Sequence, residues 1–153
     1  MIKDGLKLRG AVEIVLTDEN GYPVDTRSIN NLVVNSGLDF IGSRMLDNIT
    51  SVMSFMGLGS DNTASTSTDT DLGALVGDRE ELTTAVYSFT QSEAKITYRA
   101  TFEAGDATGD LSEAAIFNSS TGGTMLCRTT FDTLTKPAES ELSVTWVISL
   151  SVS

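Results

Sequence analysis

Carboxylates are the side chains in this sequence that could most readily do chemistry. The chain has 21 aspartates and glutamates against 10 lysines and arginines, and it has no histidine. Oxygen atoms of Asp61, Asn62, Asp69 and Asp71 could gather around calcium, which takes roughly six to eight such ligands. The spacing lacks the turn glycine and the closing glutamate of an EF-hand loop. We therefore predict a solvated polar loop here and no metal site.

A pair of carboxylates could also hydrolyse a glycosidic bond if a cleft held them about 5–10 Å apart. The sequence leaves such a pair open, but it has one tryptophan and no aromatic-rich pattern for a sugar cleft. Trp146 falls in register with apolar residues at alternate positions, which predicts a core side chain rather than a sugar platform. An acid-pair hydrolase is thus the last of the functions that we consider.

The absence of histidine removes the usual bases of enzymes, because Ser-His-Asp and Cys-His sites and imidazole-based zinc sites all need one. The single cysteine, Cys127, can form no internal disulfide, and its alternating surroundings predict a small buried side chain. The sequence also has no glycine-rich phosphate loop, paired-cysteine motif or nucleophile elbow. We predict a protein that is not an enzyme and that needs no cofactor.

Length and charge narrow the kinds of partner. The 153 residues fit a single domain, 1–153, whose core is large enough to need no disulfide or metal. A formal net charge of -11 repels phosphate backbones and anionic membrane surfaces. The start, 1–5, carries an acid and a glycine where a secretory signal would be apolar, and no run is long enough for a membrane span. We expect neither a nucleic-acid nor a membrane partner.

Alternation of apolar and polar residues predicts a protein built from strands. The clearest strand is 142–152, which is long enough to run through the middle of a sheet rather than along its edge. Residues 84–90 and 95–102 predict a hairpin. Further strands are expected at 6–16, 27–35, 52–58, 111–117 and 124–131. About eight short strands favour an all-β fold, an antiparallel two-sheet sandwich of the jelly-roll type.

One short helix is expected near residues 36–47. Ser36 has the side chain of an N-cap, and Leu38, Ile41 and Met45 follow on one face at helical spacing. Before it, Pro23 makes a central strand improbable for the segment after the Asn-Gly turn, because proline cannot donate to a strand ladder.

A long excursion at about 59–82 interrupts the pattern of short connections. Residues 61–81 carry six acids against Arg79 alone, while Leu72, Leu75, Val76 and Leu82 offer apolar anchors. Connections of this length are usually functional or disordered. We expect an arm that docks on a neighbouring subunit or protein, with a flexible loop as the alternative.

The order of several segments resembles small virion proteins of tailed bacteriophages. These segments are 56–60 with the Ser/Thr-rich stretch and leucine after it, 96–102, 111–118, 124–131 with Lys136, and the long final strand that contains Trp146. The resemblance covers most of residues 31–153. This group of proteins includes capsid cement or decoration proteins and related tail-fibre or baseplate modules.

The resemblance implies a β-sandwich that assembles on a larger shell, often as a trimer, and that carries out no catalysis. The expected partners are the major capsid protein or other virion proteins, and the expected location is the virion, after synthesis in the bacterial host cytoplasm. A tail-fibre or baseplate component and a small carbohydrate-binding module are the alternatives. The residues expected to contact partners are Lys3, Lys7, Arg9, Asp61, Asp69, Asp71, Leu72, Leu75 and Val76.

Overall fold

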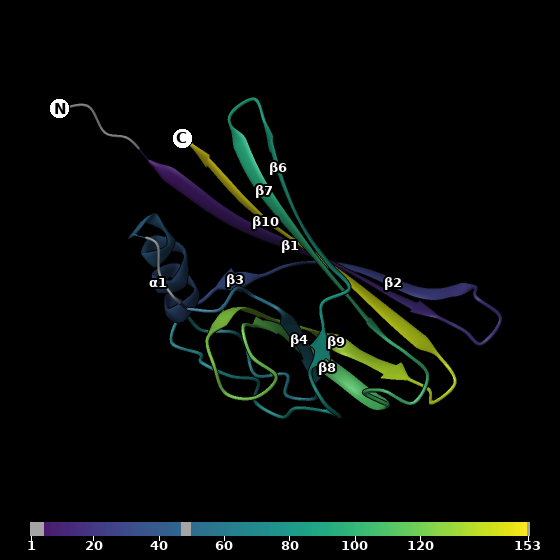
Figure 1. Ribbon diagram of the computed structural model, residues 1–153. Helices are drawn as coiled ribbons and strands as arrows, with labels where there is room; N and C mark the ends of the chain where they lie inside the picture. Colours follow the sequence, from purple (N-terminus) through teal and green to yellow (C-terminus); the bar gives the residue numbers. More distant parts are fainter. Residues whose placement is uncertain (1–4, 47–49, 153) are drawn as a thin grey trace.

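The computed structural model describes residues 5–46 and 50–152 and confirms an all-β, antiparallel two-sheet sandwich. Strands make up 55% of the chain and helical segments 8%. Within the described residues there are two sheets of five strands each, together with one short α-helix (Figure 1).

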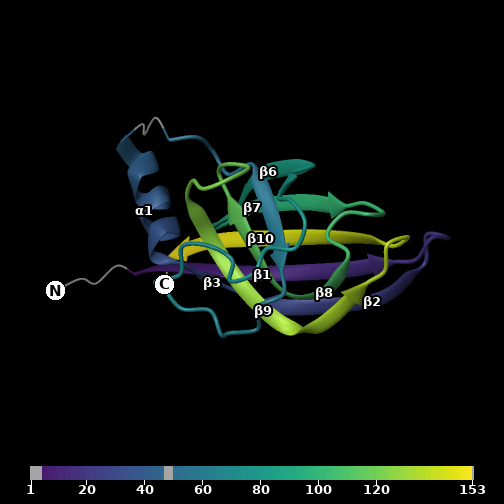
Figure 2. The same cartoon turned by 90° about the horizontal axis from the view of Figure 1, so that it is seen from below.

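The first sheet carries both ends of the chain. Its strands, in spatial order, are β2 (Pro23–Asn30), β1 (Leu6–Thr17), β10 (Glu141–Val152), β7 (Glu93–Phe102) and β6 (Thr84–Thr90). The second sheet packs across it (Figure 2). Its order is β3 (Leu32–Val33), β9 (Met125–Lys136), β8 (Gly109–Phe117), β4 (Phe55–Gly59) and β5 (Glu80–Glu81).

The final strand, β10, lies at the centre of the first sheet, as its length predicts. It pairs with β1 from Glu141 to Val152 and with β7 from Leu142 to Ser151. Val144, Trp146 and Ile148 point into the sandwich and are buried, while the residues between them are partly exposed. The prediction that Trp146 belongs to the core is confirmed.

Both faces of strand β8 are covered from Leu111 to Phe117. Leu111, Ala114 and Ile116 belong to the main core between the sheets. Ala115 and Phe117 point the opposite way, into a second and smaller apolar cluster on the outer side of the second sheet. Leu72, from the connection between β4 and β5, packs against that cluster. The long loop (residues 60–79) therefore covers the outer face of its own sheet.

The structure has ten strands rather than about eight within the described residues, and the difference arises at two places. The segment expected as one strand at 27–35 is divided at Asn31, so that β2 belongs to the first sheet and β3 to the second. The very short β5 pairs with the start of β4. Two-residue strands leave no periodic signal in a sequence. Pro23 stands at the beginning of an edge strand, as expected.

The helix α1 (Asn35–Ser43) corrects the expected helix at 36–47. Its N-cap is Val34, two residues before the predicted N-cap Ser36. The helix packs on β9, where the Ser36 hydroxyl donates to the Met125 carbonyl oxygen at 2.8 Å. A short 3-10 helix, Arg44–Leu46, follows, and residue 47 lies outside the described residues.

The expected apolar face of this helix is also wrong in part. Leu38 and Met45 are 58% and 88% exposed, whereas Phe40 and Ile41 pack against the core. Helical spacing therefore identified Ile41 correctly but not Phe40, and it placed the exposed Leu38 and Met45 on the apolar face.

Candidate functional site

A buried ion pair stands at the centre of the outer face of the second sheet. Glu113 lies on β8 and Arg128 on the neighbouring β9, and the Arg128 Nε atom donates to Glu113 Oε2 at 2.9 Å. The Glu113 side chain is fully buried, and the Arg128 side chain is 4% exposed. In the strand register Glu113 faces Thr130 and Ala115 faces Arg128, so the pair is diagonal on one face.

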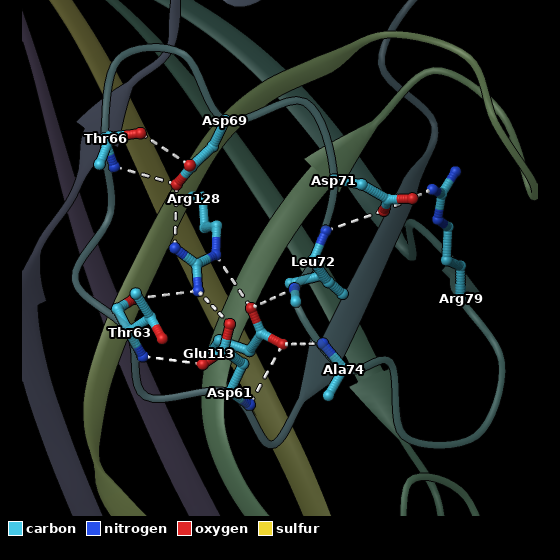
Figure 3. A network of polar contacts seen from close by, with 11 residues as sticks. Asp61, Thr63, Thr66, Asp69, Asp71, Leu72, Ala74, Arg79, Glu113 and Arg128 are labelled. Carbon is cyan, nitrogen blue, oxygen red and sulfur yellow. Dashed lines mark hydrogen bonds and ion pairs between the residues drawn. The ribbon is translucent and has the colours of Figure 1, made fainter.

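The Glu113 carboxylate holds the two ends of the long loop. Its Oε1 atom accepts hydrogen bonds from the backbone N–H of Asp61 at 3.3 Å and of Ala74 at 2.8 Å. Its Oε2 atom accepts a hydrogen bond from the backbone N–H of Gly73 at 3.0 Å (Figure 3). A buried carboxylate needs such donors to replace the water that it loses. The backbone N–H groups of the loop thus take the place of the water molecules that would otherwise solvate the Glu113 carboxylate.

The Arg128 guanidinium holds the middle of the same loop. It donates to Asp69 Oδ2 at 2.9 Å and to the Thr63 carbonyl oxygen at 3.1 Å. The Asp61 carboxylate lies 3.6 Å away as a further ion pair (Figure 3). We call Arg128, Glu113, Asp61 and Asp69 the Arg128 cluster. It places one guanidinium among three carboxylates.

Contacts in and around the Arg128 cluster favour the charged forms of Asp61, Asp69 and Arg128. Burial acts to raise the pKa of Asp69, but hydrogen bonds from Thr66 and Arg128 outweigh it and leave that pKa below 3.8. Hydrogen bonds from Thr63 lower the pKa of Asp61. Burial acts to lower the pKa of Arg128, yet hydrogen bonds to Glu113 and Asp69 leave it raised. Groups shifted away from neutrality hold structure rather than transfer protons.

A second arginine fastens the far end of the loop. The Arg79 guanidinium lies 3.4 Å from the centre of the Phe117 ring, over the smaller apolar cluster. Its Nη1 atom donates to the carbonyl oxygens of Ser119 and Gly122, both at 2.8 Å, and its Nη2 atom lies 3.2 Å from Asp71 Oδ1. This planar stacking with forked hydrogen bonds is a geometry that lysine cannot reproduce.

Close backbone contact completes the attachment of the loop. A Cβ atom at Gly59 would lie 2.5 Å from the Ala74 carbonyl oxygen and 2.3 Å from Glu113 Oε1. The Val76 N–H donates to the Leu58 carbonyl oxygen at 2.9 Å. The loop therefore fits directly against β4, where any larger residue would push it away.

The candidate calcium ligands fall into this arrangement. Asp61 and Asp69 flank the Arg128 guanidinium, which takes the position that a cation would need between them. Asp71 pairs with Arg79, and Asn62 is exposed. In residues 5–46 and 50–152 no group of three or more acidic or cysteine side chains is arranged to hold a metal ion.

Most of the predicted contact residues make contacts inside the chain. Asp61, Asp69 and Asp71 pair with arginines, Leu72 packs on the smaller apolar cluster, and Val76 packs on the main core. The remaining described ones are exposed: Lys7 and Arg9 on β1, and Leu75 in the loop. Lys3 lies outside the described residues.

Sequence patterns did not identify Glu113 or Arg128, although a signal was present. Each is the charged residue inside an otherwise apolar and small-residue strand, 111–117 and 125–129. Opposite charges in two strands joined by a short hairpin can meet on one face.

An apolar groove opens at the end of the sandwich where the first sheet extends beyond the second. Two adjoining pockets, of about 220 and 300 Å³, share Phe40, Arg44, Ile96 and Tyr98. We call this the open-end groove. Its remaining lining comes from Ile41, Val52, Met53, Ala85, Val86, Tyr87, Leu126, Ile148 and Leu150.

Burial favours the neutral forms of Tyr98 in the groove and of Cys127 beside it. Burial raises the pKa of Tyr98 to about 12. The Cys127 thiol is fully buried in the neighbouring core, and burial raises its pKa well above the ordinary value. The buried cysteine that the sequence predicts is thus confirmed. The groove offers apolar surface rather than reactive groups.

No protein family, curated protein or solved structure matches this chain in the comparisons with known proteins. Among the helices in the described part of the chain, none has the length and apolar character needed to cross a membrane.

Proposed function

We propose that this protein is a non-enzymatic structural component of a phage virion, a cement protein that binds and stabilises the assembled capsid shell. The observation that carries the binding role is the open-end groove, where apolar side chains of α1 and the first sheet lie uncovered. Exposed apolar surface of this kind marks sites of association. The assignment to a capsid rests on the resemblance of segments 56–60, 96–102, 111–118 and 124–131.

The electrostatics of the molecule support adhesion rather than turnover. In the Arg128 cluster the pKa values of Asp61 and Asp69 are lowered and that of Arg128 is raised, so these three shift away from neutrality, and all three contact or belong to the long loop. General acids and bases are instead tuned towards the working pH. A well-fastened loop presents a rigid outer surface, which lowers the entropy cost of binding a partner.

A cement protein works by mass action. A ligand that binds the assembled lattice and not the dispersed subunits stabilises the lattice by RT ln(1 + [L]/Kd) at each site. The major capsid protein is the proposed partner. Lys7 and Arg9 on β1, with Lys3 before them, give that end a basic character in an otherwise acidic chain, and Leu75 is exposed on the loop. These positions remain the proposed contact residues. The resemblance implies a trimer, and the mass of the chain in solution tests that oligomeric state.

The test is direct labelling of virions. Antibodies against the chain, carried on gold, should decorate the faces of the head in negative-stain micrographs. Label at the tail tip would favour the tail-fibre or baseplate alternative, and unlabelled particles would overturn a virion role. Purified chain should also co-sediment with assembled shells but not with dispersed capsid subunits.

A carbohydrate-binding module is the second candidate, because Tyr87 and Phe89 are exposed on β6. Trp146 cannot serve as the platform, since it is fully buried. Specific binding on a glycan array that Tyr87→Ala abolishes would support this candidate over the capsid role.

A further inference from the structure

The edge strand β6 is unlike the other strand edges of this molecule. An edge strand presents unpaired N–H and C=O groups, and proteins usually protect it with charge, proline, bulges or short length. β6 has seven residues, none of them charged and none of them proline, and all seven are exposed. Among the described residues, no strand pairs with its outer side (Figure 1). β6 therefore lacks the usual protection.

The other edges are protected. β2, at the opposite side of the first sheet, starts with Pro23 and carries Asp25 and Arg27, which form an ion pair at 3.0 Å. The edges of the second sheet, β3 and β5, have two residues each. A second copy of the chain thus offers only one edge that matches β6 in length and neutrality, and that edge is its own β6.

We propose that β6 is a self-association edge, on which a second copy pairs antiparallel about a two-fold axis that passes beside Tyr87. In this register Tyr87 faces its own equivalent, Ala85 faces Phe89, and Val86 faces Ser88. A small residue then stands opposite a large one on each face, and no like charges stand directly opposite. Pairing of identical surfaces about a two-fold axis is the commonest form of oligomer.

The net charge of the protein also favours β6 as the edge where two copies meet. Two copies with a net charge of -11 each repel one another over most of their surfaces. The neutral strand is where two such molecules can approach at the lowest electrostatic cost. Its exposed aromatic side chains, Tyr87 and Phe89 at 66% and 62%, would lose water on pairing.

The paired molecule would have one continuous sheet of ten strands. Tyr87 is paired with Ile96, and Ala85 with Tyr98, so both lie on the groove side of the sheet. A two-fold axis perpendicular to the sheet keeps that side facing the same way in both copies. The two open-end grooves would then lie next to each other. This pairing holds whether or not the protein binds a capsid.

The first test is the mass of the purified chain in solution as a function of concentration. The contact of one short strand is small beside the roughly 1,200–2,000 Å² of a standard interface, so we expect a micromolar dimer. Sedimentation velocity should show the mass rising from 16.3 kDa towards twice that value. A monomer up to about 1 mM, or a trimer, would overturn the two-fold pairing.

Charge variants identify the strand. Tyr87→Lys places like charges opposite each other and should weaken the dimer at least about tenfold. Because it lowers the net negative charge, general repulsion cannot explain the loss. Val24→Lys on β2 is the matched control, since Val24 and Tyr87 on the two edge strands are 58% and 66% exposed. A dimer that survives Tyr87→Lys, or that Val24→Lys disrupts equally, would refute the proposal.

Cross-linking gives an independent readout. The native Cys127 is fully buried, so a cysteine introduced on the surface would be the reactive thiol. Tyr87→Cys should form a covalent dimer under mild oxidation, because the residue lies opposite itself, whereas Val24→Cys should not. Equal cross-linking of the two variants, or none in Tyr87→Cys, would exclude β6 as the shared edge.

Discussion

Glu113 and Arg128 form a diagonal ion pair on two neighbouring strands, with Arg128 Nε 2.9 Å from Glu113 Oε2 and both side chains almost completely withdrawn from solvent. The pair lies between the second sheet and the long loop, and the Glu113 carboxylate also accepts hydrogen bonds from three N–H groups of the loop backbone. One carboxylate therefore joins β8 both to its neighbouring strand and to the loop.

Glu113→Gln should destabilise the protein by about 1.5–3 kcal/mol, because Arg128 loses one of its two carboxylate partners at 2.9 Å and the loop N–H groups lose a charged acceptor. Urea denaturation, followed by circular dichroism, measures the change in free energy of unfolding. Asp25→Asn is the control: it breaks the half-exposed pair with Arg27 and should cost no more than about 1 kcal/mol. Equal effects of the two substitutions would contradict the structural role of Glu113.

The stability of the loop should fall in acid because of Asp69. Its pKa in the folded protein is lowered below 3.8, so its contribution is complete above the pKa of the unfolded chain and is lost as the pH falls through the folded pKa. Asp69→Asn should thus be less stable than the parent protein at pH 7, with the difference closing in strong acid. Denaturation curves at several pH values measure it.

Glu80→Gln provides a control of opposite sign. Burial, aided by Asp106, Asp78 and Glu103, raises the pKa of Glu80, so stability is lost as the pH rises through that value. The substitution should stabilise the protein at neutral pH and have little effect in acid. The same pH dependence for the Glu80 and Asp69 variants would show that the assigned causes are wrong.

The same substitution at two positions of α1 should have opposite effects. A Cβ atom at Gly42 meets nothing within 4 Å, so Gly42→Ala should stabilise the helix by up to about 1 kcal/mol. At Gly37 it would lie 2.0 Å from the Leu126 backbone oxygen, and Gly37→Ala should cost about 1–3 kcal/mol. Melting temperatures that move in the same direction would contradict the packing of α1 on β9.

The fluorescence of Trp146 should report a dry core. This residue is the one tryptophan of the sequence, it is fully buried, and its indole N–H has no hydrogen-bond partner. We expect blue-shifted emission that iodide does not quench and that shifts to the red in urea. Emission that is already red-shifted and quenched in the native protein would place Trp146 at a surface.

The sequence predicts strands most reliably where one face is buried and the other is wet. In β10 this alternation identified the core residues and the central position. In β8 the long loop covers the second face, so seven successive residues are buried and the alternation disappears. The position of the loop depends on Glu113, Gly59 and Arg79 acting together, and contacts between distant residues leave no local pattern.

The helix shows a related limit. Helical spacing predicts Leu38, Ile41 and Met45 on one apolar face, but only Ile41 of these reaches the core, together with Phe40. Which side of a short helix is buried depends on where the neighbouring strand lies, and here the Ser36 contact with β9 sets that position.

The pairing of Leu6 with Val152 puts the first and last strands side by side with their outer ends together (Figure 1). Tension applied between these two residues would break the hydrogen bonds between β1 and β10 one pair after another from that end, instead of loading all of them at once. Such a ladder yields to weak pulling. If the protein bears mechanical load, we therefore expect its partners to bind the faces of the sheets and not the ends of β1 and β10.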